Sequence, residues 1–202
     1  MKAAQYISPG QVDLVDVPMP EPAPGQVLVR VEKIGICGSD LQILYDSAAA
    51  DYPFPPGLSG HECVGVVESA DGAQLESGAR VLVIPPKGDA LAEYLALDPY
   101  WLIPLPDGVG MEPGILAQQL GTVVFCCRKL SNVLGKTVVV VGQGPAGILF
   151  SAALNQMGAR RIIGLDIVDH RLAMARRLGA THTINVLHAD PIAEVRDLTD
   201  GQ

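Results

Sequence analysis

The chain has 202 residues, of which 49% are apolar and 18% are charged, a composition typical of a globular protein. Its formal net charge of −8 argues against non-specific binding to nucleic acid, which depends on clustered Lys and Arg. No run of roughly 18 uncharged apolar residues occurs, so we expect no transmembrane helix. The first residues lack the apolar core of a signal peptide, and we therefore expect a cytoplasmic protein.

The N-terminal half of the chain predicts a β domain. Its β-forming residues occur in short segments, several of which alternate polar with apolar side chains, and Gly or Pro separates them. The run 18–25 is rich in proline, which lacks the amide hydrogen that a central strand needs. Many short strands of this kind favour a barrel-like or partly open β domain. The predicted strands are Lys2–Ile7, Gln11–Val17, Gln26–Gly35, Cys63–Ser69, Arg80–Ile84, Ala90–Leu97 and Trp101–Pro104, with turns at Asp71-Gly72 and Ser77-Gly78.

The C-terminal half has a different pattern, in which helices alternate with apolar strands. A helix is predicted over Glu112–Leu130, and the β-branched run Lys136–Val141 is typical of a strand buried on both faces. The order that follows is βαβαβα, one half of a doubly wound parallel sheet. Its remaining predicted elements are Pro145–Met157, Arg161–Leu165, Asp169–Leu178, Thr181–Asn185 and Pro191–Leu198. The sequence therefore predicts an α/β plus β fold with domains at 1–131 and 132–202.

A glycine-rich motif follows the first strand of the second domain. Gly142-Gln143-Gly144-Pro145-Ala146-Gly147 matches G-x-G-x-x-G and opens a predicted helix, which is the context of a dinucleotide-binding loop. The first glycine makes the turn, the second lets a pyrophosphate approach, and the third lets the helix pack close to the strand. Free amides and the helix dipole then attract phosphate. The alternative is a glycine turn that binds nothing.

An acidic residue ends the next predicted strand. Asp166 can accept hydrogen bonds from both hydroxyls of an adenosine ribose and would repel a 2′-phosphate, so NAD is favoured over NADP. Arg171 lies close enough in the sequence to weaken this preference. A solvated acid at the end of a strand is the alternative for Asp166.

A second set of residues has metal-binding chemistry. Cys37 lies in Gly35-Ile36-Cys37-Gly38-Ser39-Asp40, and His61 lies in Gly60-His61-Glu62. A thiolate and an imidazole are ligands that Zn²⁺ prefers, although a lone Cys or His is more often structural. The remaining cysteines and histidines lack ligand spacing. Of these, we expect Cys63, Cys126 and Cys127 to pack in the core or between helices, and His170, His182 and His188 to lie at the surface.

These two motifs, with Gly142–Gly147 downstream, resemble the zinc-containing medium-chain dehydrogenase/reductase family, and within it alcohol, sorbitol and threonine dehydrogenases. The resemblance covers essentially the whole chain. It implies a GroES-like β domain followed by half of a Rossmann domain, and hydride transfer between NAD(H) and a secondary alcohol or polyol.

The resemblance also implies roles for individual residues. Cys37 and His61 would bind a catalytic zinc, with Glu62 as an outer or alternate ligand. Ser39 would carry the proton from the zinc-bound alcohol, and Asp40 would hold the tautomer of His61.

The chain departs from the family pattern in several places. Gln118 occupies the position of a further Cys, Glu or Asp ligand, and Gln42 replaces a histidine that completes a proton relay in many relatives. No four-cysteine lobe is present, so we expect one catalytic zinc and no structural zinc. Relatives continue past Gln202. We therefore expect the 202-residue chain alone to be nearly inactive, and the full-length form to be a homo-oligomer.

Two rival functions remain open. The first is a zinc-free reductase of the same superfamily that reduces a double bond or quinone with NADPH, against which Cys37 and His61-Glu62 count. The second is a dinucleotide-binding module without catalysis, which Gln118 favours. Bound metal in the purified protein distinguishes the first rival, and binding without hydride transfer distinguishes the second.

Overall fold

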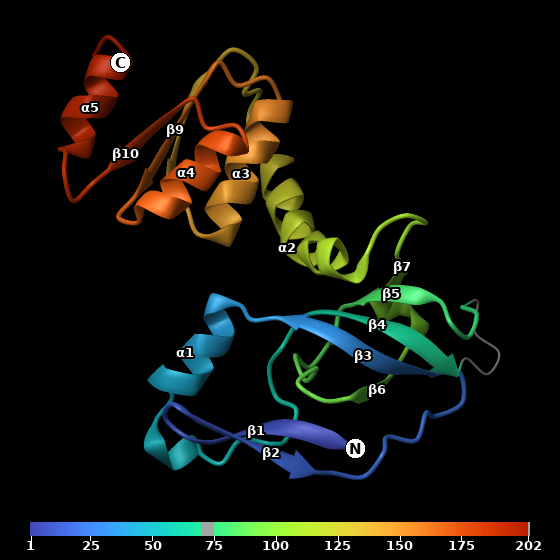
Figure 1. Ribbon diagram of the computed structural model, residues 1–202. Coiled ribbons are helices and arrows are strands. Elements are labelled where there is room, and N and C mark those ends of the chain that lie inside the picture. The colour runs from blue at the N-terminus through green and yellow to red at the C-terminus, as the bar shows by residue number, and fades with distance from the viewer. Residues whose placement is uncertain (70–74, 202) are drawn as a thin grey trace. The chain divides into compact units, whose positions relative to one another are not determined.

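The computed structural model describes residues 1–69 and 75–201. The described chain forms two compact units, Met1–Gln118 and Gln119–Gln202 (Figure 1). The first is mainly β-structure and the second alternates strands with helices, so the predicted α/β plus β fold class is confirmed. The turn predicted at Asp71-Gly72 lies outside the described residues. Within the described residues, no helix combines the length and the apolar character needed to cross a bilayer.

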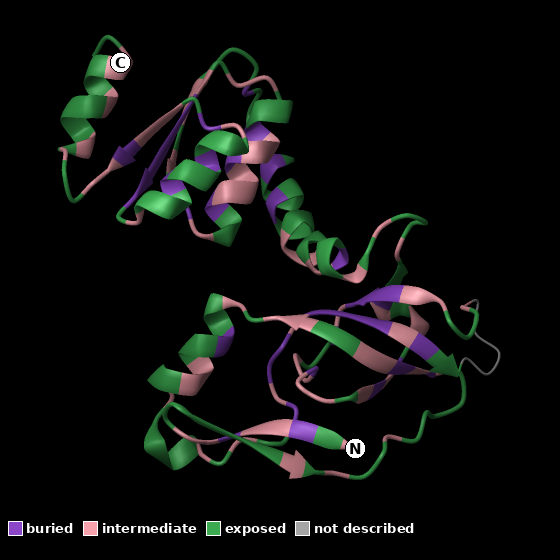
Figure 2. Ribbon diagram, viewed as in Figure 1, coloured by how far each residue is buried: buried purple, intermediate pink, exposed green. Residues whose placement is uncertain are grey.

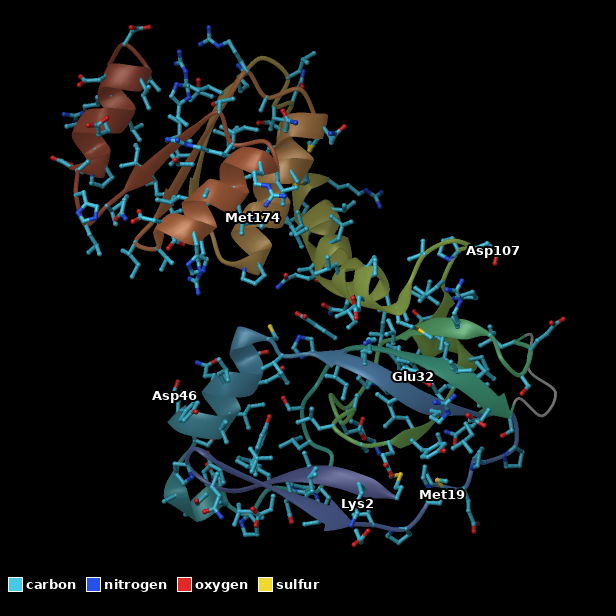
Figure 3. All side chains as sticks on the ribbon, viewed as in Figure 1. Lys2, Met19, Glu32, Asp46, Asp107 and Met174 are labelled. Carbon is cyan, nitrogen blue, oxygen red and sulfur yellow. The ribbon has the colours of Figure 1, made fainter. Side chains whose placement is uncertain are left out.

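An antiparallel sheet is the centre of the first unit. Among the described residues it has five strands in the order β6-β3-β4-β5-β7. Their bounds are Val27–Gly35 for β3, Glu62–Ser69 for β4, Arg80–Val83 for β5, Tyr94–Leu97 for β6 and Leu102–Pro104 for β7. A separate hairpin joins β1 (Lys2–Ser8) to β2 (Gln11–Asp16). An ion pair between Lys2 Nζ and Asp16 Oδ2, 2.7 Å apart, links its two strands; Lys2 is labelled in Figure 3.

The main hydrophobic cluster of the first unit lies on one face of this sheet. Val27 and Val29 of β3 are fully buried and pack with residues of β4, β5, β6 and β7; buried residues are purple in Figure 2. Strands β3 and β4 approach very closely at Gly65, where an added Cβ would lie 2.4 Å from the carbonyl oxygen of Arg30. A residue with a side chain therefore does not fit at this position.

Two predicted segments of the first unit are shorter in the structure. The strand predicted over Ala90–Leu97 begins only at Tyr94, because residues 90–93 hydrogen-bond to several different segments. Leu91 N donates to Gly57 O, and Glu93 N donates to Lys2 O. The last predicted strand begins with a 3₁₀ turn, η2 (Pro99–Trp101), before β7.

Helices also occur in the first unit. Sequence analysis did not predict α1 (Gly38–Asp46), a short helix that begins with glycine, or the 3₁₀ turn η1 (Ala49–Asp51). The long helix predicted over Glu112–Leu130 is present as α2 (Met111–Cys127). This helix starts in the first unit and ends in the second.

The second unit contains a parallel sheet. Its described residues form strands β8 (Thr137–Val141), β9 (Arg161–Asp166) and β10 (His182–Asn185) in the order β10-β9-β8. The helices that alternate with them are α3 (Pro145–Gln156), α4 (Asp169–Arg177) and α5 (Pro191–Leu198). The predicted βαβαβα order is confirmed.

Helices cover the central strand β9 on both faces. Ile162 packs with α3 and α4, whereas Ile163 and Leu165 pack with α5. The prediction that the first strand is buried on both faces is wrong. Val139 and Val141 of β8 are 38% and 82% exposed, because α5 packs against β9 and β10 on that face.

Candidate functional site

A buried carboxylate connects the two halves of the predicted metal motif. Cys37 precedes α1, and its backbone N donates to Asp40 Oδ2 at 2.7 Å. Asp40 Oδ1 accepts hydrogen bonds from Ser59 Oγ and from Gly60 N. Asp40 is 2% exposed, so water does not compete for these bonds. The first turn of α1 is thereby attached to the segment that leads directly into His61.

The pairing of β3 with β4 brings a second carboxylate to the same place. Glu62 begins β4 opposite Gly35 of β3, and a Cβ on Gly35 would lie 2.9 Å from Glu62 Oε2. A side chain at residue 35 would therefore clash with the Glu62 carboxylate, and glycine avoids this clash. Glu62 is buried.

Ligand atoms of Cys37, His61 and Glu62 all lie within 4.8 Å of one another. Two atoms that bind one zinc ion tetrahedrally at 2.0–2.3 Å are themselves about 3.3 to 3.8 Å apart, so the 4.8 Å limit lies about 1 Å above this spacing. The donor set of thiolate, imidazole and carboxylate suits Zn²⁺. By spacing and by chemistry, the three residues therefore fit a zinc ion.

The predicted contact between Asp40 and His61 is indirect. His61 Nδ1 lies 3.7 Å from Asp40 Oδ1, which is too long for a hydrogen bond. Asp40 instead positions the backbone just before His61 through Ser59 and Gly60. Sequence analysis missed Ser59, a non-glycine residue with a φ of 87°.

Two further predicted site residues lie on helices. Ser39 is exposed in the first turn of α1, and within residues 1–69 and 75–201 its side chain has no hydrogen-bond partner. Gln118 is half-buried on α2. Their roles in proton transfer and metal binding remain predictions.

The other cysteines differ in their surroundings. Cys63 is fully buried, and burial raises the pKa of its thiol to about 12, which keeps it protonated and unreactive. Cys127 is also buried, and burial, followed by the neighbouring Cys126, raises the pKa of its thiol. The expectation that Cys126 packs in the core or between helices is wrong, because adjacent helical positions point in different directions and Cys126 is exposed.

The glycine-rich loop has the expected form between β8 and α3. Gly142 has a φ of +85°, and its N donates to Leu165 O at 2.8 Å, which makes the turn next to β9. Gly144 is the N-cap of α3, Pro145 occupies the first turn, and Ala146 follows it. An added Cβ on Gly147 would lie only 1.9 Å from Gly142 O, whereas one on Gly144 would meet nothing within 4 Å. Gly147 therefore allows close packing, and Gly144 leaves open space.

Asp166 lies at the end of β9, next to this loop. Its Oδ2 accepts from Gln143 N at 2.6 Å and its Oδ1 from Val168 N at 2.9 Å. Burial acts to raise the pKa of Asp166, but the backbone amides, first that of Gln143, and the charge of Arg171 together hold the pKa below its ordinary value. Asp166, Arg171 and Gly142 line one cavity of about 460 Å³, so the structure brings these predicted residues together.

The side chain of Gln143 was not predicted as a functional group, although the residue lies within the glycine-rich motif. This side chain and that of Ser151 are fully buried and hydrogen-bonded to each other. Two patterns could have indicated them: a long polar residue between two glycines, and a hydroxyl in the otherwise mainly apolar helix 145–156.

Comparisons with known proteins agree with this arrangement. Residues 23–120 match the alcohol dehydrogenase GroES-like domain, and residues 145–202 match the zinc-binding dehydrogenase domain. An alcohol dehydrogenase from Cupriavidus necator is 30% identical over 100% of this chain and 68% of its own length. Sorbitol dehydrogenase from Rattus norvegicus is 30% identical over 91% of this chain and 60% of its own length.

Solved structures give the same fold. The crystal structure of a quinone oxidoreductase from Pseudomonas syringae pv. tomato DC3000 matches with a TM-score of 0.83 and 28% identity, over 99% of this chain and 63% of that one. The chain thus spans between 60% and 68% of the length of these three proteins.

Proposed function

Because the chain belongs to the zinc-dependent medium-chain dehydrogenase/reductase family, we propose that it provides the zinc site and part of the NAD(H) site of an alcohol or polyol dehydrogenase. One observation carries the proposal: a thiol, an imidazole and a carboxylate lie within 4.8 Å of one another at Cys37, His61 and Glu62. Residues 1–131 act as the zinc domain with its linking helix, and residues 132–202 as part of the NAD domain.

Each residue of the metal site has a defined task. Cys37 and His61 hold one catalytic zinc, Glu62 offers a third ligand or approaches the ion from outside, and Gln118 is an auxiliary ligand. When bound by these residues, zinc would supply Lewis-acid chemistry that makes the hydroxyl of an alcohol substrate more acidic. Ser39 accepts the alcohol proton at its hydroxyl, and its exposure at the start of α1 lets it pass that proton to water.

The second unit binds the adenosine and pyrophosphate of the cofactor. The loop of Gly142, Gly144, Pro145, Ala146 and Gly147 presents the free amides of α3 to the pyrophosphate. Asp166 receives the ribose hydroxyls, and its negative charge favours NAD over NADP. Arg171 lies in the same cavity, where it moderates this preference.

Metal content tests the first part of the proposal. The chain is expressed with added zinc and purified, and its metal content is measured by inductively coupled plasma mass spectrometry. We expect one zinc ion per molecule. Cys37→Ala and His61→Ala lose the ion, because each removes a ligand from a group of three. Cys126→Ala is the matched control, since its thiol is exposed on α2, outside the cluster. A metal-free parent chain contradicts the zinc site and favours the zinc-free reductase.

The two rivals predict different binding and activity. The zinc-free NADP(H) quinone or enone reductase is favoured by the similar quinone oxidoreductase structure and by Arg171. It binds NADP more tightly than NAD in calorimetry. A non-catalytic dinucleotide-binding module binds NAD but transfers no hydride from any alcohol, even in a version with the length of the relatives. We further infer a cytoplasmic location and a homo-oligomer for the whole protein.

A further inference from the structure

We infer that Gln143 is a positioning residue that fixes the glycine-rich loop in its binding conformation; this inference rests on the proposed cofactor function. Its side chain is 0% exposed, and a buried amide needs hydrogen-bond partners. Gln143 finds them on two different elements. Its Nε2 donates to Val140 O in β8 at 3.0 Å, and its Oε1 accepts from Ser151 Oγ in α3 at 3.0 Å.

Strand β9 provides the space that this side chain occupies. A Cβ on Gly164 would lie 3.0 Å from Cδ and 3.1 Å from Nε2 of Gln143. The neighbouring residues Ile163 and Leu165 face α5, so Gly164 faces the side covered by α3. The amide therefore lies between α3 and the sheet, directly above a residue without a side chain.

The backbone at Gln143 is held separately from its side chain. Gln143 N donates to Asp166 Oδ2 at 2.6 Å, and this bond joins the loop to the end of β9. Residue 143 is thus attached to β8, β9 and α3 at once. The amides of Ala146 and Gly147 follow in the first turn of α3, where they have no intrahelical acceptor and point toward a phosphate.

The attachment of residue 143 to β8, β9 and α3 should increase the affinity for a dinucleotide. A loop that is already fixed loses little conformational freedom when pyrophosphate arrives, so more of the contact energy appears as affinity. Loss of the side-chain hydrogen bonds lets the loop sample other conformations and weakens dinucleotide binding. The bonds do not touch the ligand themselves.

A pair of variants separates this positioning role from a purely structural one. Ser151→Ala leaves Oε1 of Gln143 unpaired in a buried place, which lowers both stability and loop order. The double variant Gln143→Leu with Ser151→Ala replaces both partners by apolar groups, so much of the stability returns. In the double variant the backbone bond from residue 143 N to Asp166 remains, but the side-chain bonds to β8 and α3 are missing, so the affinity for the dinucleotide stays low.

The experiment uses calorimetric titration of the 202-residue chain with NAD⁺ and with ADP-ribose, together with melting followed by circular dichroism. We expect both the single and the double variant to raise the dissociation constants about 5- to 30-fold, while the double variant melts above the single one. Thr181→Val is the matched control. Thr181 Oγ1 bonds to both N and O of Ile162 at the beginning of β9, so its loss destabilises the unit without touching the loop.

Several outcomes would overturn the role of Gln143. One is recovery of the parental affinity in the double variant together with its stability. Another is an equal loss of affinity in Thr181→Val. A parent chain that binds neither NAD⁺ nor ADP-ribose overturns the proposed cofactor function itself. A parent that binds both, with variants of unchanged affinity, overturns only the positioning role.

Discussion

Replacement of Gly144 by Ala separates cofactor binding from folding. Gly144 has a φ of −67°, which any residue adopts, and an added Cβ meets no atom within 4 Å. We therefore expect the free energy of unfolding to change by less than about 1 kcal/mol. The same methyl group lies where a pyrophosphate would approach the backbone. Losing hydrogen bonds to a charged group costs about 1.5–3 kcal/mol, so the dissociation constant for NAD⁺ should rise about 10- to 100-fold.

Gly147→Ala is the matched comparison, and it acts on the fold. Its Cβ would lie 1.9 Å from Gly142 O, and since real contacts stay beyond 3.0 Å, loop and helix must separate by about 1.1 Å (3.0 minus 1.9). Overpacking of this kind costs about 1–3 kcal/mol, which lowers the melting temperature of a unit of this size by roughly 4–8 °C per kcal/mol.

Calorimetry with NAD⁺ and melting by circular dichroism measure both effects on both variants. Parental affinity in Gly144→Ala would refute the reasoning, because the second glycine would then not be needed for the approach of the pyrophosphate. A low melting temperature for Gly144→Ala would refute it in another way, by showing a structural role for this position.

Three further predictions concern stability. Gly65→Ala places a Cβ 2.4 Å from Arg30 O, so the free energy of unfolding of the first unit should fall by about 1–3 kcal/mol, measured through the fluorescence of Trp101. Unchanged unfolding contradicts the close approach of β3 and β4. Gly121 lies inside α2, and a Cβ added there would meet nothing within 4 Å. Gly121→Ala should therefore raise the free energy of unfolding in urea by about 0.5–1 kcal/mol; no gain contradicts the helical assignment of this residue. Asp166→Asn tests the lowered pKa of Asp166. Because its pKa is lower in the folded state, the ionised carboxylate stabilises the fold above about pH 4, where an unfolded aspartate is ionised. This stabilisation is lost as the pH falls through the folded pKa. The difference in melting temperature between Asp166→Asn and the parent should therefore become smaller from pH 7 to pH 3. A constant difference contradicts the lowered pKa of Asp166.

Local patterns in the sequence predicted much of the fold. The loop 142–147 was predictable because its three glycines act over a few residues, and a turn, an open position and a close contact follow from their spacing alone. Helices α3 and α4 were predictable for the same reason, since period and glycine stops are local signals.

Non-local relations were less predictable. The composition of β8 shows that it is a strand but not which neighbours cover it, so the exposure of Val139 and Val141 could not be inferred. Helix α1 escaped prediction because it is short and begins with glycine, and an N-cap cysteine is not a usual start signal. Cys37 nevertheless lies directly before this helix, at its N-cap.

In both candidate sites, a buried carboxylate accepts hydrogen bonds from backbone amides that are distant in the sequence. Asp40 accepts backbone hydrogen bonds from Cys37 and from Gly60, 20 residues away along the chain. Asp166 accepts one from Gln143, 23 residues away. In each case a buried carboxylate attaches one functional segment to another through peptide amides, which every residue but proline possesses. Because most of these donors are backbone amides, residue chemistry and the family resemblance could indicate that Cys37 and His61 suit one metal ion, but the sequence could not show what brings them together. The metal motif is therefore held together by a buried carboxylate that backbone amides and the Ser59 hydroxyl bond, and these bonds are visible only in three dimensions.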